Sequence, residues 1–158
     1  MVRKTQGGPL KVSSVCYILQ IEDWNWSYSF GVNEPRYNGR TYGDYRHIVV
    51  RAEVLLPSKL KLKARTAELT FMPDVQLANI EQKREHRPTG VGYIDVREAR
   101  LTGGFSMSAD ALGPVMQMLV AGRFKYIVLD GERLRYRKAR IRNYRFETQI
   151  ALDEYPDD

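Results

Sequence analysis

The chain has little of the material from which catalytic and membrane-spanning sites are built. Its 158 residues include one cysteine, Cys16, and two histidines, His47 and His86. A lone cysteine excludes an internal disulfide, so packing has to hold the fold together. Two histidines exclude most histidine-based metal sites unless carboxylates supply the other ligands. No run of about 18 consecutive apolar residues occurs, and the sequence therefore predicts no membrane span.

Motifs that bind nucleotides or cofactors are also missing from the sequence. Residues 91–104 have glycines at both ends, but they lack the strand–loop–helix order that cradles a phosphate. Cys16 and His47 would make a nucleophile–base pair if the fold brought them together. An isolated cysteine in a strand is more often a small core residue. We therefore predict no cofactor and no metal site, and favour a non-enzymatic protein, with an enzyme on a β scaffold as an alternative.

The chain length and composition are those of a single globular domain. Residues 1–11 are predicted to form a flexible lead-in, because "QGGP" interrupts them before any apolar stretch of a signal peptide. Residues 12–152 form the predicted β-rich domain, and residues 153–158 form an acidic C-terminal tail. A single free cysteine fits the reducing cytoplasm, which is the compartment we expect.

Alternation of apolar and polar residues dominates the sequence, and this period of two predicts half-buried strands. Residues 24–32, "WNWSYSFGV", alternate strictly, and a change of phase near Asp23 indicates a bulge or a turn. Residues 47–56 and 60–71 alternate as well, with Leu62 among the positions expected to face the core. Residues 91–101 form a less regular strand. We expect a mainly β fold without a parallel sheet, either one antiparallel β-sandwich-like domain or a partly open barrel.

One amphipathic α-helix is predicted near residues 109–121. Ser108 or Asp110 is a candidate for its N-terminal cap, and Gly122 follows at the expected C-terminal position. A second short helix over residues 75–86 has a weaker pattern. The apolar stripe of the first helix consists of Leu112, Val115, Met116 and Leu119.

The most unusual segment is "RLRYRKARIRNYRF", residues 133–146, which carries seven cationic side chains. Its apolar residues change parity twice, and two β-bulges, at residues 137–138 and 142–143, would place them all on one face. Short strands joined by tight turns are the alternative. Either arrangement turns the cations to solvent. These cations are Arg133, Arg135, Arg137, Lys138, Arg140, Arg142 and Arg145.

The dipeptide Asp130-Gly131, just before this segment, predicts a two-residue hairpin turn. Pairing across such a turn would set Tyr126 opposite Arg135, where a guanidinium group can stack on the ring. The expected result is a basic sheet face that includes one aromatic side chain.

The net charge of +6 conceals an uneven distribution along the chain. The tail "DEYPDD" carries four carboxylates and no cation, which leaves +10 on residues 1–152. Charge of this size favours an anionic partner, either an acidic protein or a nucleic acid. The alternative is a solvated charge run, or one that the acidic tail neutralises by folding back.

Residues 33–46, "NEPRYNGRTYGDYR", show no periodicity and are predicted to form a long loop. Tyrosine, arginine, glycine and asparagine are typical of binding loops. The candidates for a second contact patch are Arg36, Tyr37, Arg40, Tyr42 and Tyr45. The aromatic residues of 24–30 are expected to face the core because polar residues alternate with them, and a stacking platform for sugars or bases is the alternative.

These observations favour a non-enzymatic binding module that contacts an anionic partner through residues 133–145 and 33–46. The alternative is a self-assembling scaffold component, in which the acidic tail of one copy docks on the arginines of another. A homo-oligomer is compatible with both hypotheses, and neither requires a membrane.

Overall fold

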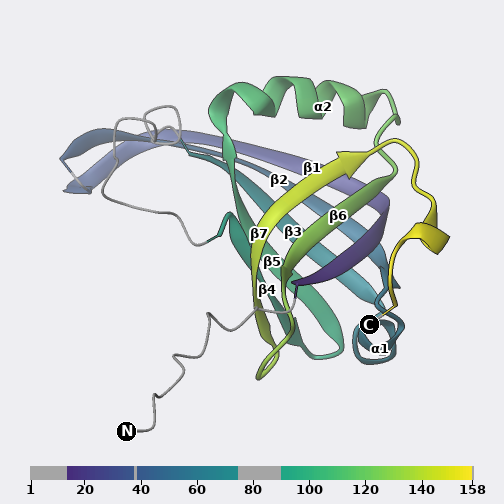
Figure 1. The fold of residues 1–158 in the computed structure, drawn as a ribbon. Helices are drawn as coiled ribbons and strands as arrows, with labels where there is room; N and C mark the ends of the chain where they lie inside the picture. Colours follow the sequence, from purple (N-terminus) through teal and green to yellow (C-terminus); the bar gives the residue numbers. More distant parts are fainter. Residues whose placement is uncertain (1–13, 38, 75–89, 158) are drawn as a thin grey trace, which may run out of the picture.

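The computed structural model describes residues 14–37, 39–74 and 90–157, with the backbone alone at residues 35–37. Seven strands close into a barrel in the order β1-β2-β3-β5-β4-β7-β6 (Figure 1). Neighbouring strands are antiparallel, except that β3 and β5 pair in parallel. The mainly β prediction is therefore confirmed, although the sheet is a closed ring with one parallel pair. The strands are β1 (Ser14–Tyr37), β2 (Arg40–Leu56), β3 (Thr66–Asp74), β4 (Gly92–Arg97), β5 (Arg100–Ser108), β6 (Tyr126–Glu132) and β7 (Lys138–Glu147).

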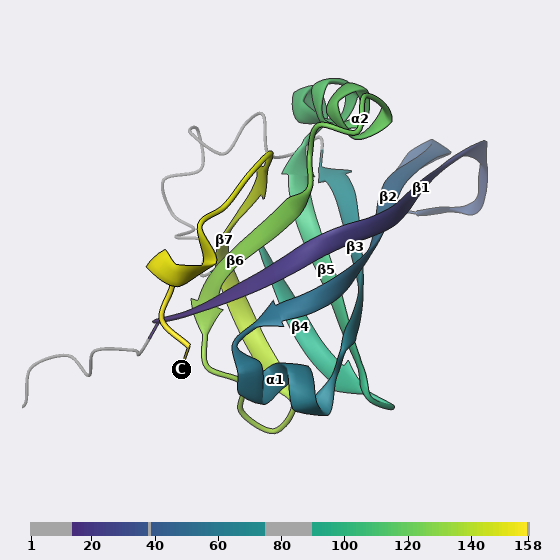
Figure 2. The ribbon, with the colours of Figure 1, turned by 90° about the vertical axis from the view of Figure 1, so that its right-hand side faces the viewer.

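Two short helices lie at opposite ends of the barrel (Figures 1 and 2). The helix α2 (Leu112–Val120) follows a 3₁₀ turn, η2 (Ala109–Ala111), and confirms the helix predicted near 109–121. Leu112 and Leu119 are buried, so the predicted stripe does face the core. Ser108 precedes the 3₁₀ turn without a side-chain capping hydrogen bond, and Gly122, the second residue after the helix, has a φ of 62°. The helix α1 (Ser58–Lys63) lies at the other end. None of the described helices is long and apolar enough to cross a membrane.

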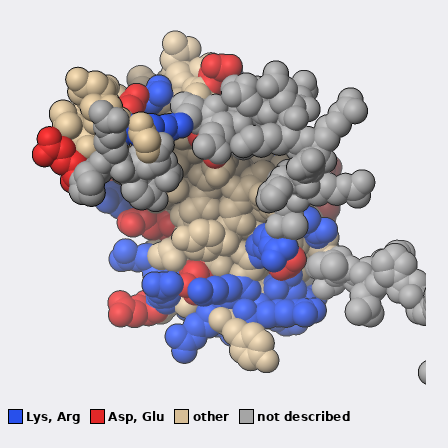
Figure 3. All heavy atoms as spheres, turned by 90° about the vertical axis from the view of Figure 1, so that its left-hand side faces the viewer, with Lys and Arg blue, Asp and Glu red and all other residues tan. Residues whose placement is uncertain are grey.

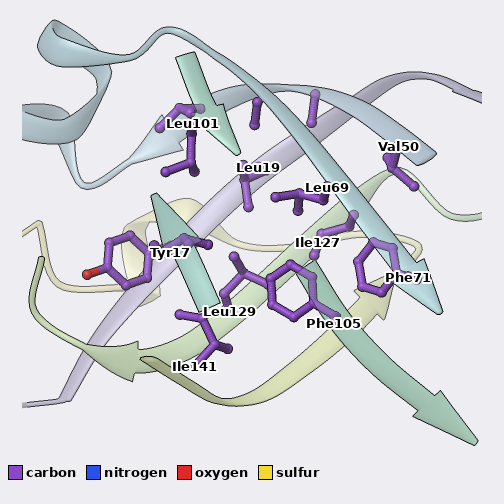
Figure 4. Packing of buried hydrophobic residues seen from close by; sticks show 14 of the residues in the cluster. Tyr17, Leu19, Val50, Leu69, Phe71, Leu101, Phe105, Ile127, Leu129 and Ile141 are labelled. Carbon is purple, nitrogen blue, oxygen red and sulfur yellow. The ribbon is translucent and has the colours of Figure 1, made fainter. Parts of the chain in front are cut away.

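Side chains from all seven strands fill the inside of the barrel (Figure 4). The rings of Phe71 and Phe105 stack with their centroids 5.0 Å apart, and Tyr144 and Phe146 pack against Phe71 at similar distances. This aromatic cluster joins β3, β5 and β7, which are distant in the sequence. Burial of large rings is the main stabilising contribution in such a core.

Two of the predicted strands are wrong in part. Residues 58–63 form α1 instead of a strand, and Leu62 is 89% exposed. Two residues of a helix that are two positions apart point about 200° away from each other, so Leu60 can be buried while Leu62 faces solvent. Residues 91–101 contain a hairpin, because Glu98 and Ala99 have positive φ and form the turn between β4 and β5. The helix predicted at 75–86 and the lead-in at 1–11 lie outside the described residues.

The strands β1 and β2 continue beyond the barrel as a two-stranded ribbon, residues 25–47, which we call the arm (Figures 1 and 2). The strand β1 pairs with β6 only as far as Gln20, and β2 pairs with β3 only from Ile48 onward. Between these points, within the described residues, the two strands pair only with each other. The long loop predicted at 33–46 is therefore wrong. Residues 33–46 lack the alternation that identifies a strand, unlike residues 24–32, and because both faces of the arm are exposed, no burial imposes it on them.

Candidate functional site

The turn between β6 and β7 carries the densest group of cations and has the geometry of a tight hairpin. The amide of Arg135 donates to the carbonyl of Lys138 (2.8 Å), and the amide of Lys138 donates back to that of Arg135 (2.9 Å). The two central residues, Tyr136 and Arg137, have φ values of 50° and 73°, as a type I′ turn requires. The Tyr136 side chain is fully exposed. The turn therefore presents an aromatic ring between two arginines.

The hairpin turn predicted at Asp130-Gly131 is wrong, because Gly131 continues β6 and pairs with Ile141. A Cβ atom at Gly131 would lie 2.4 Å from the carbonyl oxygen of Arg140. The glycine is therefore needed for a close approach of two strands. Tyr126 consequently pairs with Glu147, not with Arg135, and lies at the far end of β6 from the β6–β7 turn.

The bulge predicted at residues 142–143 is confirmed. The register passes from Asp130 opposite Asn143 to Gly131 opposite Ile141, which leaves Arg142 as the extra residue. The bulge predicted at 137–138 is instead the hairpin turn, which was the alternative. The apolar residues of β7 face the core. Six cations are exposed on the outside: Arg133, Arg135, Arg137, Lys138, Arg140 and Arg142.

Arg145 differs from these six cations because partners in its own chain neutralise it. Its guanidinium donates to Asp130 (2.9 Å), to Glu147 (3.1 Å) and to the hydroxyl of Tyr155 in the tail (3.4 Å). Arg145 is therefore a structural residue that holds the tail against β7.

The acidic tail is fixed at a second point, next to α1. Asp157 accepts hydrogen bonds from the amide of Ser58 (2.6 Å) and from the Ser58 hydroxyl. Both hydrogen bonds lower the pKa of Asp157, and the one from the Ser58 side chain has the larger effect. In the described tail, no carboxylate forms an ion pair with the six exposed cations. The part of the tail that the structure describes therefore does not neutralise them.

Three elements lie next to one another at the end of the barrel opposite α2 (Figure 2): α1, the β4–β5 turn and the β6–β7 turn, which we call the basic turn. Lysine and arginine side chains gather over this end (Figure 3). We call it the basic end and define it by its cations, Lys59, Lys63, Arg133, Arg135, Arg137, Lys138 and Arg140.

Two hollows lie in the surface of the basic end. One, of about 480 Å³, lies between Lys63, Glu98 and Arg137 over an apolar floor that includes Val96 and Leu134. The other, of about 190 Å³, extends between Lys59 and Arg133 above Leu60 and Leu134. Both are lined by Lys63 and Leu134, so they adjoin. A shallower depression beside Lys138 and Arg140 adds further cationic surface.

The lysines of α1 are the part of this site that the sequence did not reveal. The run "KLKLK" alternates like a strand, a pattern that places its lysines on the solvated face of the strand predicted there. The helix instead brings Lys59 and Lys63 to the rims of the two hollows, beside Arg133 and Arg137.

The second predicted contact patch lies elsewhere. Arg40, Tyr42 and Tyr45 are exposed on the arm, away from the basic end, while the side chains of Arg36 and Tyr37 lie outside the described residues. The two predicted patches do not form one surface.

No catalytic pair results from Cys16 and His47. Cys16 lies opposite Asp130, whereas His47 lies opposite Ser27, eleven residues further along β1, which is about 35 Å of strand. Burial, together with the charge of Asp130, raises the pKa of the Cys16 thiol to about 12. This is opposite to the shift that activates a thiol. Among the described residues, no group of three or more His, Cys, Asp or Glu side chains is placed to hold a metal ion.

The chain matches no protein-family model, no curated protein and no solved structure. The basic end is therefore judged by its own geometry and charge.

Proposed function

We propose that the protein is a non-enzymatic binding module that holds a strand of nucleic acid against the basic end of the barrel. One observation carries this proposal. Several exposed cations elsewhere on the barrel, such as Arg51, Arg65 and Arg97, form ion pairs within the chain. At the β6–β7 turn, four adjacent cations from 133 to 138 have no ion-pair partner among the described residues. Phosphate groups would satisfy such cations and release counterions.

Tyr136 favours a nucleic acid over an acidic protein. The ring is fully exposed at the tip of a tight turn, where burial offers no reason for an aromatic residue. Its neighbours, Arg135 and Arg137, are exposed as well. An aromatic ring on which a base stacks, with arginines beside it for the phosphates, is the combination that proteins use for single strands. Carboxylates of an acidic protein would engage the arginines and leave the ring unused.

The acidic tail supports binding by this surface more than assembly through the tail. Its contacts go to Ser58 and Arg145 of the same chain. A second copy would have to displace them before it could receive the tail. As part of the same proposal, we assign the protein to the reducing cytoplasm, where nucleic acid is present and a free cysteine stays reduced.

The test is fluorescence anisotropy of a labelled single-stranded oligonucleotide at several salt concentrations. The double substitution R135Q/R137Q removes two proposed phosphate contacts. It should weaken binding and lower the slope of log affinity against log salt by about 1.4, at about 0.7 per contact. The control R123Q/K125Q removes the same charge from exposed residues that follow α2, at the other end of the barrel, and should leave the slope nearly unchanged.

Equal losses in the two double variants would mean that only the overall charge matters, and would contradict a site at the basic end. Binding of polyglutamate with higher affinity than the oligonucleotide would assign the surface to an acidic protein instead.

A further inference from the structure

The aromatic residues of β1 lie on the side of the arm that continues the inside of the barrel. Residues directly opposite each other in an antiparallel pair point to the same face. Trp24 lies opposite Val50 and Trp26 opposite Ile48, and both of these partners are buried in the barrel. The prediction that the stripe faces the core holds for Trp24, which packs against it, but not beyond. The strands extend past the end of the barrel, where no core remains to cover the row.

Beyond Trp24, this face of the arm is exposed, and we call its apolar side chains the aromatic row. The aromatic row consists of Trp26, Tyr28, Phe30 and Val32 of β1 and Tyr42 of β2. Their exposed fractions range from 43% to 64%. Phe30 and Tyr42 stack with their ring centroids 5.5 Å apart, and Trp26 lies 6.4 Å from Tyr28. These contacts join the four rings in two pairs, which follow each other along one face of the arm.

The opposite face of the arm is mostly polar along β1. Asn25, Ser27 and Ser29 occupy it, together with Gly31. The arm is therefore an amphipathic ribbon whose apolar face has no partner among the described residues. A two-stranded ribbon alone is at best marginally stable in water, and a second apolar layer would stabilise it.

The arm is nearly neutral, unlike the rest of the chain. Residues 25–47 contain two acidic residues and three arginines, so all but one unit of the excess of +6 comes from other segments. On the side of the aromatic row, Arg46 pairs with Asp44 at 3.5 Å. A nearly neutral surface attracts a polyanion only weakly, and it matches itself across a two-fold axis, because each Asp44 can face an Arg46 of the other copy.

The exposed area is sufficient for a weak dimer. With about 200 Å² for a large aromatic side chain, these exposed fractions leave on the order of 500 Å² per copy. A two-fold pair would bury on the order of 1,000 Å², which is the lower limit for a specific interface. We propose that the arm is a dimerisation element, and that the aromatic row packs face to face against the same row of a second copy of this chain.

The test compares two substitutions on opposite faces of the same ribbon, F30S and Y45S. Phe30 and Tyr45 are 64% and 58% exposed, but only Phe30 belongs to the aromatic row. In sedimentation equilibrium, the wild type should associate as its concentration rises. F30S should raise the dimer dissociation constant about tenfold or more, and Y45S should leave it unchanged. Because both side chains are exposed, the barrel should fold in either variant, which near-ultraviolet circular dichroism can verify.

The two tryptophans of the chain, Trp24 and Trp26, provide a second measurement. With W24F, the remaining indole reports on the aromatic row alone. Its quenching by acrylamide should decrease as the protein is concentrated. Two outcomes would overturn the proposal. If acrylamide quenches Trp26 strongly at every protein concentration, the aromatic row does not bind a second copy and is left for another partner. If Trp26 is protected even in dilute, monomeric protein, the same chain covers the aromatic row.

This inference is independent of the proposed function. Dimerisation through apolar side chains should persist from about 0.1 M to about 1 M salt, at which charges are screened within a few ångströms. Nucleic-acid binding should be lost over the same range. R135Q/R137Q should leave the dimer intact, and F30S should leave the affinity of the basic turn for an oligonucleotide within about twofold when both are measured as monomers.

Discussion

The basic end and the arm differ in what each leaves without a partner among the described residues. At the basic end, the exposed groups are cations above a small apolar floor, and at the arm they are aromatic rings on a nearly neutral ribbon. Between these two regions, the described barrel has no buried side-chain nitrogen or oxygen atom without a hydrogen bond. One fold thus separates a cationic surface from an apolar one. In our proposals, salt would control binding at the first surface, and protein concentration would control association through the second.

The largest expected effect comes from comparing two phenylalanines on the same side of the sheet. Phe71 is fully buried opposite Ile48, whereas Phe30 lies further out on the arm, 64% exposed. F71A should lower the free energy of unfolding by about 3–5 kcal/mol, because it opens a cavity in the aromatic cluster. F30A should lower it by less than about 1 kcal/mol. Urea unfolding of dilute, monomeric protein measures both. Similar losses would mean that the arm is part of the core.

A smaller effect should separate stacking from charge at the basic end. Y136N removes the ring and keeps a residue that tolerates the positive φ of this turn. Loss of one stacked base should weaken oligonucleotide binding by about 1–3 kcal/mol, with no change in the salt slope. Y136F should bind like the wild type. A change of slope in Y136N would show that the substitution disturbs the arginines, and an unchanged affinity would remove stacking from the proposal.

The smallest expected effect concerns the tail and depends on pH. Hydrogen bonds from Ser58 lower the pKa of Asp157 in the folded protein. A lowered carboxyl pKa stabilises the fold above the pKa of the unfolded chain, and this contribution disappears as pH falls through the folded value. The wild type should therefore be slightly more stable than D157N at neutral pH, and the difference should vanish in acid. Thermal melts of both proteins between neutral and strongly acidic pH would measure it. A difference that persists in acid would assign the effect to something other than the ionised carboxylate.

The sequence predicted those elements in which burial imposes a period. The helix at 112–120 and the strand around 47–56 were found because one side of each faces the core. In the arm, residues 24–32 alternate and are predicted as a strand, whereas residues 33–46 have no period that distinguishes them from a loop, since a ribbon with both faces in solvent has no such constraint. Asp130-Gly131 has the composition of a turn, but its glycine serves a close contact with Arg140, and both uses look alike in a sequence.

The candidate site was predictable in its charges but not in its arrangement. Exposure of Arg133, Arg135 and Arg137 follows from the local pattern. The neutralisation of Arg145, by contrast, depends on Asp130 and Tyr155, which no local pattern pairs with it. The lysines of α1 join the site only because the barrel closes through long-range pairings, such as that of β1 with β6. Such pairings depend on the whole chain, and no local sequence pattern in the paired segments predicts them.

A single extra residue at the base of the arm has a geometric consequence. The pairing of β1 with β2 passes from Ile21 opposite Ala52 to Asp23 opposite Arg51, so Glu22 is inserted as the bulge expected near Asp23. An odd insertion reverses the parity of everything beyond it, and it also bends and twists the strand. Glu22 thus fixes both the side on which the rings emerge and the angle at which the ribbon leaves the barrel. In a pair of molecules joined through their ribbons, this one residue would set how far apart the two positively charged ends are held and in which directions they point.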